Sequence, residues 1–403
     1  MGAVRIDAGV LIPGRGEPIT DGSVVFDGGR IEYVGATSGA PDAATEVAVA
    51  TVMPGIWECH AHFTGITRAD LEREMVEPVA TRAARVVGDL GATLMGGVTS
   101  AREVGGLGID VRHAIADGSI QGPSIYAAGR VLSTTGGHAD VHAYPLDWVN
   151  SAENRIGALC DGVPECLKAV RMNLRKGADV IKICASGGVM SEIDHPVHQQ
   201  FSGDELRAIV EETARAERVV AAHCHGKPGI MAALEAGVKT IEHGSYLDEE
   251  AAEAMVEADA ILVPTRYVIE TLLAMEDALP AYAYRKGQMV ATVHEQAMKI
   301  AVATGVKIAT GTDIFVSGAM YGRNSQEIRH LIEAGMTPLD ALEAATATGP
   351  ETLGPQAPLS GQLKEDYDAD VIALDFDPLS DWAPWGDADR ITHVWKAGQA
   401  VKG

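Results

Sequence analysis

The sequence predicts an α/β protein built as a (β/α)8 TIM barrel, with a small β-sandwich domain formed by both chain ends. Three observations lead to this prediction. Short β-branched runs alternate with Ala-rich amphipathic stretches in the middle of the chain, both ends show the two-residue period of strands, and histidines recur where predicted strands end. We expect residues 1–53 to form the N-terminal part of the sandwich, 54–345 the barrel, and 346–403 the C-terminal part of the sandwich.

Charge and composition exclude several classes of protein. The 403 residues carry 32 Lys and Arg against 56 Asp and Glu, and the resulting net charge of -24 would repel a nucleic acid. Apolar runs long enough to cross a membrane are missing, and charges among the first twenty residues argue against a secretory signal. Five scattered cysteines suit a reducing compartment. We therefore expect a cytoplasmic protein with neither a membrane nor a nucleic-acid partner.

In the barrel region each strand signal is followed by a turn and then by a helical stretch. Eight such units in roughly 290 residues match the size of a closed barrel, and a doubly wound sheet is the alternative that the sequence separates poorly from it. Ser202 and Glu205 form a capping box at one helix start. The expected strands are 54–62, 97–103, 124–131, 179–185, 219–225, 240–244, 261–265 and 307–313. The expected helices are 71–94, 166–176, 203–217, 229–236, 248–257, 280–304 and 325–334.

The two chain ends carry hairpin signals. The turn Asp27-Gly28-Gly29 joins two alternating runs near the N-terminus, and a second hairpin is expected around residues 397–399. Each end is too short to bury a core alone. We therefore expect both ends to pack together as one β domain beside the barrel.

The segment at the end of the first predicted barrel strand is the most informative one for function. His60 and His62 lie two residues apart, so both side chains leave the same face of the strand at its C-terminal end, where barrels place their active sites. Alone, such a pair is more often structural than metal-binding. The pair gains weight because His223, His243 and Asp313 end three other predicted strands, and imidazole and carboxylate are the ligand types that suit Zn²⁺.

A lysine occupies the fourth predicted strand. Lys182 lies between Ile181 and Ile183 in a run that should be buried, and a buried lysine without a partner is costly. The alternative is a surface lysine whose amine reaches solvent, which the apolar neighbours make improbable. Lys182 is therefore expected at the same site as the histidines.

These motifs identify a resemblance to a known family. The segments 53–55, His60-x-His62, 311–313 and 369–372 are similar to those of the amidohydrolase superfamily, and within it to imidazolonepropionase-like and prolidase-like enzymes. The resemblance implies a lysine carboxylated by CO2 at Lys182, bridging two divalent metal ions that are expected to be zinc. By the same match, the first ion has His60, His62 and Asp313 as ligands, the second has His223 and His243, and Lys182 contacts both.

Two neighbouring metal ions can lower the pKa of a shared water, so that a metal-bridging hydroxide attacks an amide carbonyl at neutral pH. Asp313 can take the proton of that water and deliver it to the leaving nitrogen. By resemblance, His138 in the Gly136-Gly137-His138 segment hydrogen-bonds the substrate carbonyl. Asp313 and His138 are therefore the expected catalytic residues.

The expected substrate is a small molecule that bears a carboxylate: an N-acyl amino acid, a dipeptide or a related small amide. Cations just beyond strand ends could grip that carboxylate. The apolar segment 314–322 also admits a hydrophobic substrate group. The candidate substrate-binding residues are His225, Lys227, Arg266, Tyr267, Tyr321 and Arg323.

Several alternatives stay open at this point. The same two metal ions would support hydrolysis of a cyclic amide or lactone, and of an aryl or alkyl carbamate or urea. A site with a single ion, in which Lys182 forms only a salt bridge, is a further alternative. A catalytically silent barrel scaffold is the non-enzyme alternative. Members of the family often assemble, so a homo-oligomer is expected.

Overall fold

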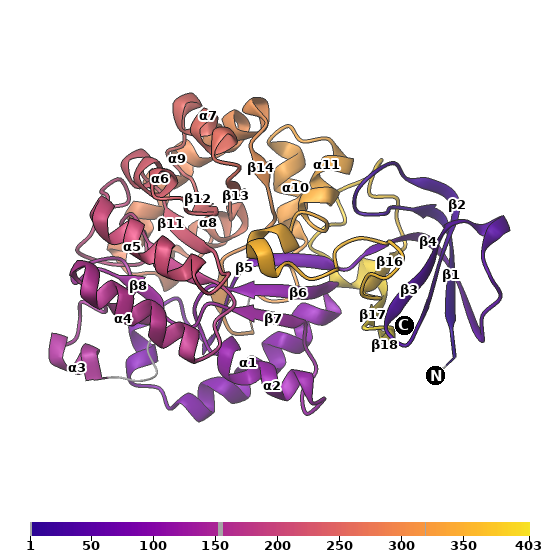
Figure 1. Ribbon diagram of the computed structural model, residues 1–403, viewed down its shortest axis with the longest axis horizontal. Helices are drawn as coiled ribbons and strands as arrows, with labels where there is room; N and C mark the ends of the chain where they lie inside the picture. Colours follow the sequence, from indigo (N-terminus) through magenta and orange to yellow (C-terminus); the bar gives the residue numbers. More distant parts are fainter. Residues whose placement is uncertain (1, 152–155, 319) are drawn as a thin grey trace.

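The computed structural model describes residues 2–151, 156–318 and 320–403. Figure 1 shows two bodies side by side along the long axis of the molecule: a barrel with its helices, and a β domain that contains both chain ends. Among the described residues, no helix has the length and apolar character that crossing a membrane requires.

The β domain is one seven-stranded sheet to which both chain ends contribute. Its strand order is β18-β17-β16-β4-β1-β2-β3, and the neighbours are antiparallel except for the parallel pair of β1 and β4. The N-terminal strands are β1 (Val4–Leu11), β2 (Ile19–Asp27), β3 (Arg30–Ala36) and β4 (Thr45–Pro54). The C-terminal strands are β16 (Val371–Leu374), β17 (Ile391–Lys396) and β18 (Gln399–Lys402).

This sheet curls over itself. Phe26 on β2 and Trp395 on β17 are far apart in the strand order, yet their ring centroids lie 6.3 Å apart in an edge-to-face contact. Both side chains belong to one buried apolar cluster with Ile6, Val52 and Val371. The curl therefore encloses a core, as expected for the sandwich, and both predicted hairpins are present as β2–β3 and β17–β18.

The barrel strands form two arcs. The first arc has the order β15-β5-β6-β7 and the second β14-β13-β12-β11-β10-β8-β9. The first-arc strands are β5 (Ile56–Ile66), β6 (Val98–Glu103), β7 (Ser124–Ala127) and β15 (Ile314–Val316). The second-arc strands are β8 (Val131–Ser133), β9 (Gly157–Leu159), β10 (Ile181–Cys184), β11 (Val220–Cys224), β12 (Thr240–His243), β13 (Ile261–Val263) and β14 (Lys307–Ile308).

Backbone hydrogen bonds join the two arcs into a closed barrel. On one side, the Asp179 amide donates to the carbonyl of Ala127 at 2.8 Å. On the other, the amide of Cys59 donates to Thr310 at 2.9 Å, and the amide of Asp313 donates to His60 at 2.7 Å. The predicted barrel is therefore confirmed, and the doubly wound alternative is wrong because an open sheet would leave these two edges unpaired.

The helices surround the barrel, and the capping box of Ser202 and Glu205 is present at the start of α5. Four helices were not predicted: α2, α3, α8 and α11. The α-helices are α1 (Val79–Met95), α2 (Gly108–Ala116), α3 (Leu146–Ser151), α4 (Gly162–Arg175), α5 (Gly203–Ala214), α6 (Lys227–Glu235), α7 (Glu249–Glu257), α8 (Arg266–Leu273), α9 (Ala281–Thr304), α10 (Gln326–Glu333) and α11 (Pro338–Ala344). The 3-10 helices are η1 (Thr37–Gly39), η2 (Leu71–Met75), η3 (Glu276–Ala278), η4 (Pro350–Gln356) and η5 (Ala388–Arg390).

The curled sheet predicts which tryptophan stabilises the β domain. Trp395→Ala would leave a cavity against Phe26 and lower the free energy of unfolding by about 3–5 kcal/mol. Trp382→Ala is the matched control, because this side chain is 37% exposed, and we expect a loss below about 1 kcal/mol. Urea unfolding followed by circular dichroism measures both values. Equal losses in the two variants would contradict the packing described here.

Candidate metal centre

Three polar side chains meet at β5, which continues to Ile66, beyond the end at residue 62 expected from the sequence. His60 and His62 lie on β5, and Asp313 follows β14, which the closure of the barrel brings alongside. Oδ1 of Asp313 lies 3.2 Å from Nε2 of His62 and 3.5 Å from Nε2 of His60. The ligand atoms of the three residues all lie within 4.8 Å of one another, so one cation could contact them all.

A second group consists of three histidines. His223 on β11, His225 directly after that strand and His243 at the end of β12 also have ligand atoms within 4.8 Å of one another. The ring centroids of His60 and His243 are 4.9 Å apart, so the two groups are neighbours. From the sequence, His225 is expected in the substrate pocket. It does line the cavity, and its ring nitrogen is also close enough to those of His223 and His243 to bind the same metal ion.

Lys182 on β10 is buried beside both groups. Its Nζ lies 3.4 Å from Nε2 of His60, and no carboxylate of the described residues lies within salt-bridge distance of it. Burial lowers the pKa of Lys182 and outweighs the opposing charge of Glu242. The expected meeting of Lys182 with the histidines is thus present in the structure.

Each histidine of the two groups has one ring nitrogen in a hydrogen bond that points away from the centre. This arrangement leaves the second nitrogen facing inward, where its lone pair can bind a cation. The outward pairs are His60 Nδ1 with Glu242 (2.7 Å), His62 Nδ1 with the Gly105 carbonyl (2.7 Å), His223 Nε2 with the Gly187 carbonyl (3.1 Å), His225 Nδ1 with Ser245 (2.8 Å) and His243 Nδ1 with Thr265 (2.7 Å).

The partner of His60 is itself half of a buried ion pair. Nη2 of Arg102 contacts the two carboxylate oxygens of Glu242 at 2.8 and 2.9 Å, and both side chains are buried. Burial opposes the ionisation of Glu242, but the charge of Arg102 and the hydrogen bond with His60 outweigh it and hold the pKa of this carboxyl well below its usual range. Burial lowers the pKa of His60 to about 4, which keeps its inward lone pair free at neutral pH.

Glu58 fixes the other side of the same group. Its buried carboxylate accepts hydrogen bonds from the amides of His60 and Thr312, both at 2.9 Å, and from Nδ2 of Asn324 at 2.7 Å. Asp313, the next residue, has a left-handed backbone with φ +57, which a non-glycine residue adopts only at a cost. The bonds to Glu58 therefore stabilise the turn that directs Asp313 toward the histidines.

The donor set fits divalent cations of the zinc type. Imidazole nitrogens and a carboxylate oxygen converge, the histidine rings have hydrogen-bond partners on their other nitrogens, and the buried amine of Lys182 lines the same cavity as both groups. The structure thus brings together all six residues that sequence analysis expected as metal ligands: His60, His62, Lys182, His223, His243 and Asp313.

A cavity of about 120 Å³ opens beside these ligands, and His138 and His225 line it as well. The rest of its wall is almost entirely apolar. From the apolar segment 314–322, Phe315 reaches the cavity, while Ala319 lies outside the described residues. The other wall residues are Leu71, Val131, Ala139, Ile156, Cys184, Val189, Met190, Val268, Ile269, Leu272, Gly287 and Val290.

The structure does not bring the three predicted substrate-binding cations to this cavity. Lys227 begins α6 and pairs with Asp248 at 2.6 Å and with Glu250, both at the start of α7. Arg266 begins α8 and lies 3.2 Å from Glu270 one turn later, and Arg323 is solvent-exposed. Lys227 and Arg266 are thus the first residues of helices, and each pairs with a carboxylate instead of lining the cavity.

The two predicted tyrosines have structural contacts. The hydroxyl of Tyr321 donates to the carbonyl of His62 at 2.7 Å, and its ring stacks on Phe63. The hydroxyl of Tyr267 donates to the carbonyl of Met320 at 3.2 Å. Tyr321 therefore supports the part of β5 that carries His62, and neither ring is part of the cavity wall described above.

Arg102, Glu242 and Glu58, which hold the candidate metal ligands in place, were not among the site residues expected from the sequence. A signal was available, since each is a charged residue inside a predicted buried strand, the same feature that singled out Lys182. Their mutual pairing was not visible, because Arg102 and Glu242 are 140 residues apart along the chain.

Comparison with known proteins identifies the family and the fold. The family model described as Amidohydrolase family matches residues 51–401. An ochratoxinase from Aspergillus niger is 43% identical over 99% of this chain and 86% of its own length. The crystal structure of A. niger ochratoxinase superposes with a TM-score of 0.93 over 100% of this chain and 96% of that one, at 42% identity. A prolidase complexed with N-methylphosphonate-L-proline has a TM-score of 0.91 at 33% identity, with 99% of both chains covered. The resemblance inferred from the motifs is confirmed.

The contact between Glu242 and His60 predicts an effect on metal affinity. Glu242→Gln would keep the shape of the side chain but remove the charge that Arg102 and His60 both contact, so we expect metal affinity to fall about 10- to 100-fold. Competition with a chromogenic chelator measures the affinity. Glu250→Gln, which alters an exposed carboxylate paired with Lys227, is the matched control and should leave it unchanged. Equal affinities in both variants would contradict a role for the buried pair.

Proposed function

The chain belongs to the amidohydrolase family, and from this premise we propose that it hydrolyses the amide C–N bond of a small molecule with the aid of two divalent metal ions. One observation carries the proposal: two groups of ligand atoms are neighbours, with the ring centroids of His60 and His243 4.9 Å apart, and the buried amine of Lys182 lies 3.4 Å from His60. A single structural ion would need only one of these groups.

In the proposed arrangement His60, His62 and Asp313 hold the first ion, and His223 and His243 hold the second. His225 lies close enough to be a further ligand of the second ion. When bound, two such ions, expected to be zinc, lower the pKa of water so that hydroxide is available at neutral pH. The distances between the ligand atoms support this assignment.

Lys182 is proposed to be carboxylated by CO2 and to contact both ions. An ammonium group beside two dications would be strongly repelled, whereas a carbamate supplies negative charge at the same place. Burial lowers the pKa of Lys182 and so shifts it toward the neutral amine, which is the form that reacts with CO2. Burial also keeps the modified side chain away from bulk solvent.

Asp313 would transfer the proton of the attacking water, and His138 would bind the substrate carbonyl. The carboxylate of Asp313 faces the inward nitrogens of His60 and His62, so it can accept the proton of the attacking water and pass it to the leaving nitrogen. His138 lines the same cavity and would hydrogen-bond the substrate carbonyl. Leaving-group protonation then completes the cleavage of the amide.

The apolar character of the cavity wall indicates which class of substrate the cavity accepts. Besides Lys182, no lysine or arginine of the described residues lines the cavity, whereas α8 and α9 contribute Val268, Ile269, Leu272 and Val290. We therefore propose a small amide with a bulky apolar or aromatic group, and an N-acyl amino acid of this kind fits best. The similarity to ochratoxinase over nearly the whole chain supports this choice. Any recognition of a substrate carboxylate would then depend on the metal ions or on backbone amides.

A substrate panel tests the proposed reaction. Purified metal-loaded protein is assayed against ochratoxin, aromatic N-acyl amino acids, dipeptides, cyclic amides, lactones, aryl carbamates and ureas. We expect the highest kcat/KM for aromatic N-acyl amino acids or ochratoxin. Activity confined to cyclic amides or lactones would contradict the proposed class of linear amide substrates. Activity on carbamates or ureas alone would show that the substrate is a carbamate or urea and not an N-acyl amino acid.

Metal removal provides the second test. A chelator should lower hydrolysis by about 1,000-fold or more, and two equivalents of Zn²⁺ together with bicarbonate should restore it. Lys182→Ala should fail to recover under the same conditions. One metal ion per chain with no need for bicarbonate would favour the single-ion site, and a protein that neither holds metal nor hydrolyses any substrate would favour the scaffold.

The apolar wall predicts a difference between substrates. Leu272→Ala would enlarge the cavity, so we expect KM for a bulky aromatic amide to rise about tenfold and KM for a small amide to change less than about twofold. Met289→Ala on α9 is the matched control, because this side chain is 44% exposed and lies outside the cavity wall. An equal rise in KM for both substrates would show that Leu272 does not select for bulk.

Assembly and cellular location stay predictions. The family often forms homo-oligomers, and we expect the same of this chain, with a cytoplasmic location and no nucleic-acid partner in view of its net charge of -24. Sedimentation equilibrium of the purified protein would test the assembly.

A further inference from the structure

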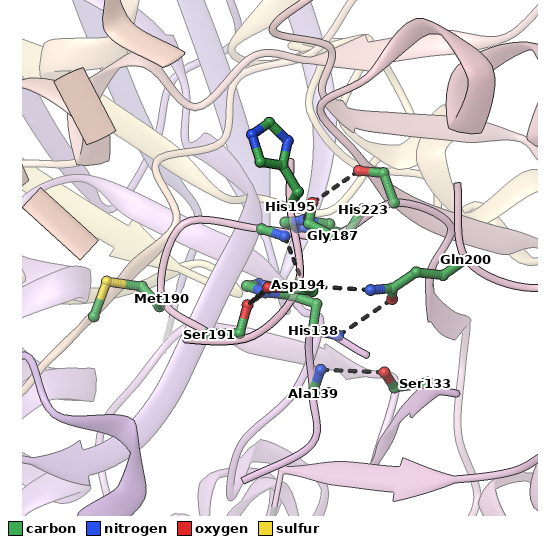
Figure 2. A network of polar contacts seen from close by, with 12 residues as sticks. Ser133, His138, Ala139, Gly187, Met190, Ser191, Asp194, His195, Gln200 and His223 are labelled. Carbon is green, nitrogen blue, oxygen red and sulfur yellow. Dashed lines mark hydrogen bonds and ion pairs between the residues drawn. The ribbon is translucent and has the colours of Figure 1, made fainter. Parts of the chain in front are cut away.

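The loop between β10 and α5, residues 185–202, contacts His138 and the neighbouring His223 (Figure 2). Nδ1 of His138 lies 2.8 Å from Oγ of Ser191. The same hydroxyl donates a hydrogen bond to Oδ1 of Asp194, and Oδ2 of Asp194 lies 3.8 Å from Nδ1 of His138. A carboxylate is thus linked to the ring through one hydroxyl.

Asp194 is held firmly in this position. Its Oδ2 accepts hydrogen bonds from the Gly188 amide at 3.0 Å and from Nε2 of Gln200 at 3.3 Å. Nζ of Lys286, on α9, lies 3.2 Å from Oδ1 and also donates to the carbonyls of Gly188 and Ser191. Burial opposes the ionisation of Asp194, but the charges of His138 and Lys286 and the bond from Ser191 outweigh it and lower the pKa of this carboxyl.

The chemistry of these groups sets the direction of each hydrogen bond. An ionised carboxylate only accepts, so the single proton of the Ser191 hydroxyl is donated to Asp194. The Ser191 oxygen must then accept from His138, which places a proton on Nδ1. For Nε2 of His138, no hydrogen-bond partner occurs within the described ranges of the chain, and the ring lines the metal-centre cavity.

Close packing fixes the ring as well. A Cβ on Gly188 would lie 2.1–2.6 Å from three atoms of the His138 ring, so only glycine fits there. On its other side, the ring stacks on His223 with centroids 4.2 Å apart and an angle of 21° between the planes. The ring is therefore held between the loop backbone and an expected metal ligand, and rotation about its χ2 angle would break the bond to Ser191.

We propose that Asp194 and Ser191 are positioning residues that hold His138 by its Nδ1, so that Nε2 faces the substrate carbonyl. The inference rests on the proposed function, in which His138 contacts that carbonyl. Lys286 and Gly188 keep this arrangement in place without contacting the substrate.

The first test is spectroscopic and needs no substrate. Zinc-loaded protein labelled with ¹⁵N-histidine should show His138 protonated at Nδ1. In Asp194→Asn the new amide can donate to Ser191, which turns the hydroxyl proton toward His138, so the Nδ1–H signal should be lost or shifted toward the lone-pair position. A wild-type ring without a proton on Nδ1 would overturn the proposal.

The second test separates positioning from folding. Ser191→Ala and Asp194→Asn should lower kcat by about 10- to 100-fold and change KM by less than about threefold, with metal content and Tm within the range of the control. Ser191→Thr retains the hydroxyl and should recover most of the activity. Gly188→Ala, which displaces the ring without altering any charge, should lower kcat in the same way.

Asp140→Asn is the matched control. Asp140 lies two residues after His138 and accepts a hydrogen bond from the Gly136 amide at 2.9 Å, but it has no contact with the ring. Wild-type kcat in Asp194→Asn, or a loss of activity that follows loss of metal or a lower Tm, would overturn the positioning role. If no amide is hydrolysed by the wild type, the proposed function fails, and the state of Nδ1 still decides the positioning claim.

Discussion

The buried pair of Arg102 and Glu242 is the contact on which the candidate metal centre depends most. Two charges inside a barrel are tolerated only if each is fully hydrogen-bonded. Arg102 meets this condition through Glu242, the Cys59 carbonyl and Thr240, and Glu242 completes it with Nδ1 of His60. As a consequence His60 cannot turn, and its other nitrogen faces inward. The buried ion pair thus fixes the orientation of the His60 ring.

The same logic extends around the barrel. Closure places residues 309–313 against β5, and Glu58 on β5 holds the Thr312 amide, so that Asp313 is directed to the histidines despite its left-handed backbone. The remaining histidines each have an outward hydrogen-bond partner of their own. The closed barrel therefore brings to one rim both the ligands and the partners that orient them.

The elements outside the barrel decide what can reach this rim. Helices α8 and α9 and the loop after β10 supply most of the apolar wall, and that same loop contacts His138 through Ser191 and Gly188. One segment therefore takes part both in shaping the substrate cavity and in orienting a proposed catalytic group. Lys286 anchors this loop to α9 with bonds to three of its residues, which couples the cavity wall to the ring position.

Periodicity along the chain was enough to predict most barrel strands, the hairpins of the β domain and the ligands near the strand ends, because burial imposes a local pattern of apolar and polar residues. It did not predict the short strands β9 and β15, nor the division of the expected strand 124–131 into β7 and β8. Spacing by two residues placed His60 and His62 on one face for the same reason. The tertiary structure alone decided where Lys227, Arg266 and Arg323 lie, that residues 266–273 form a helix, that His225 joins the second group, and that Arg102 meets Glu242. These features depend on partners far apart in the chain, and side-chain direction beyond a strand end follows from the packing of its neighbours, which no local pattern records.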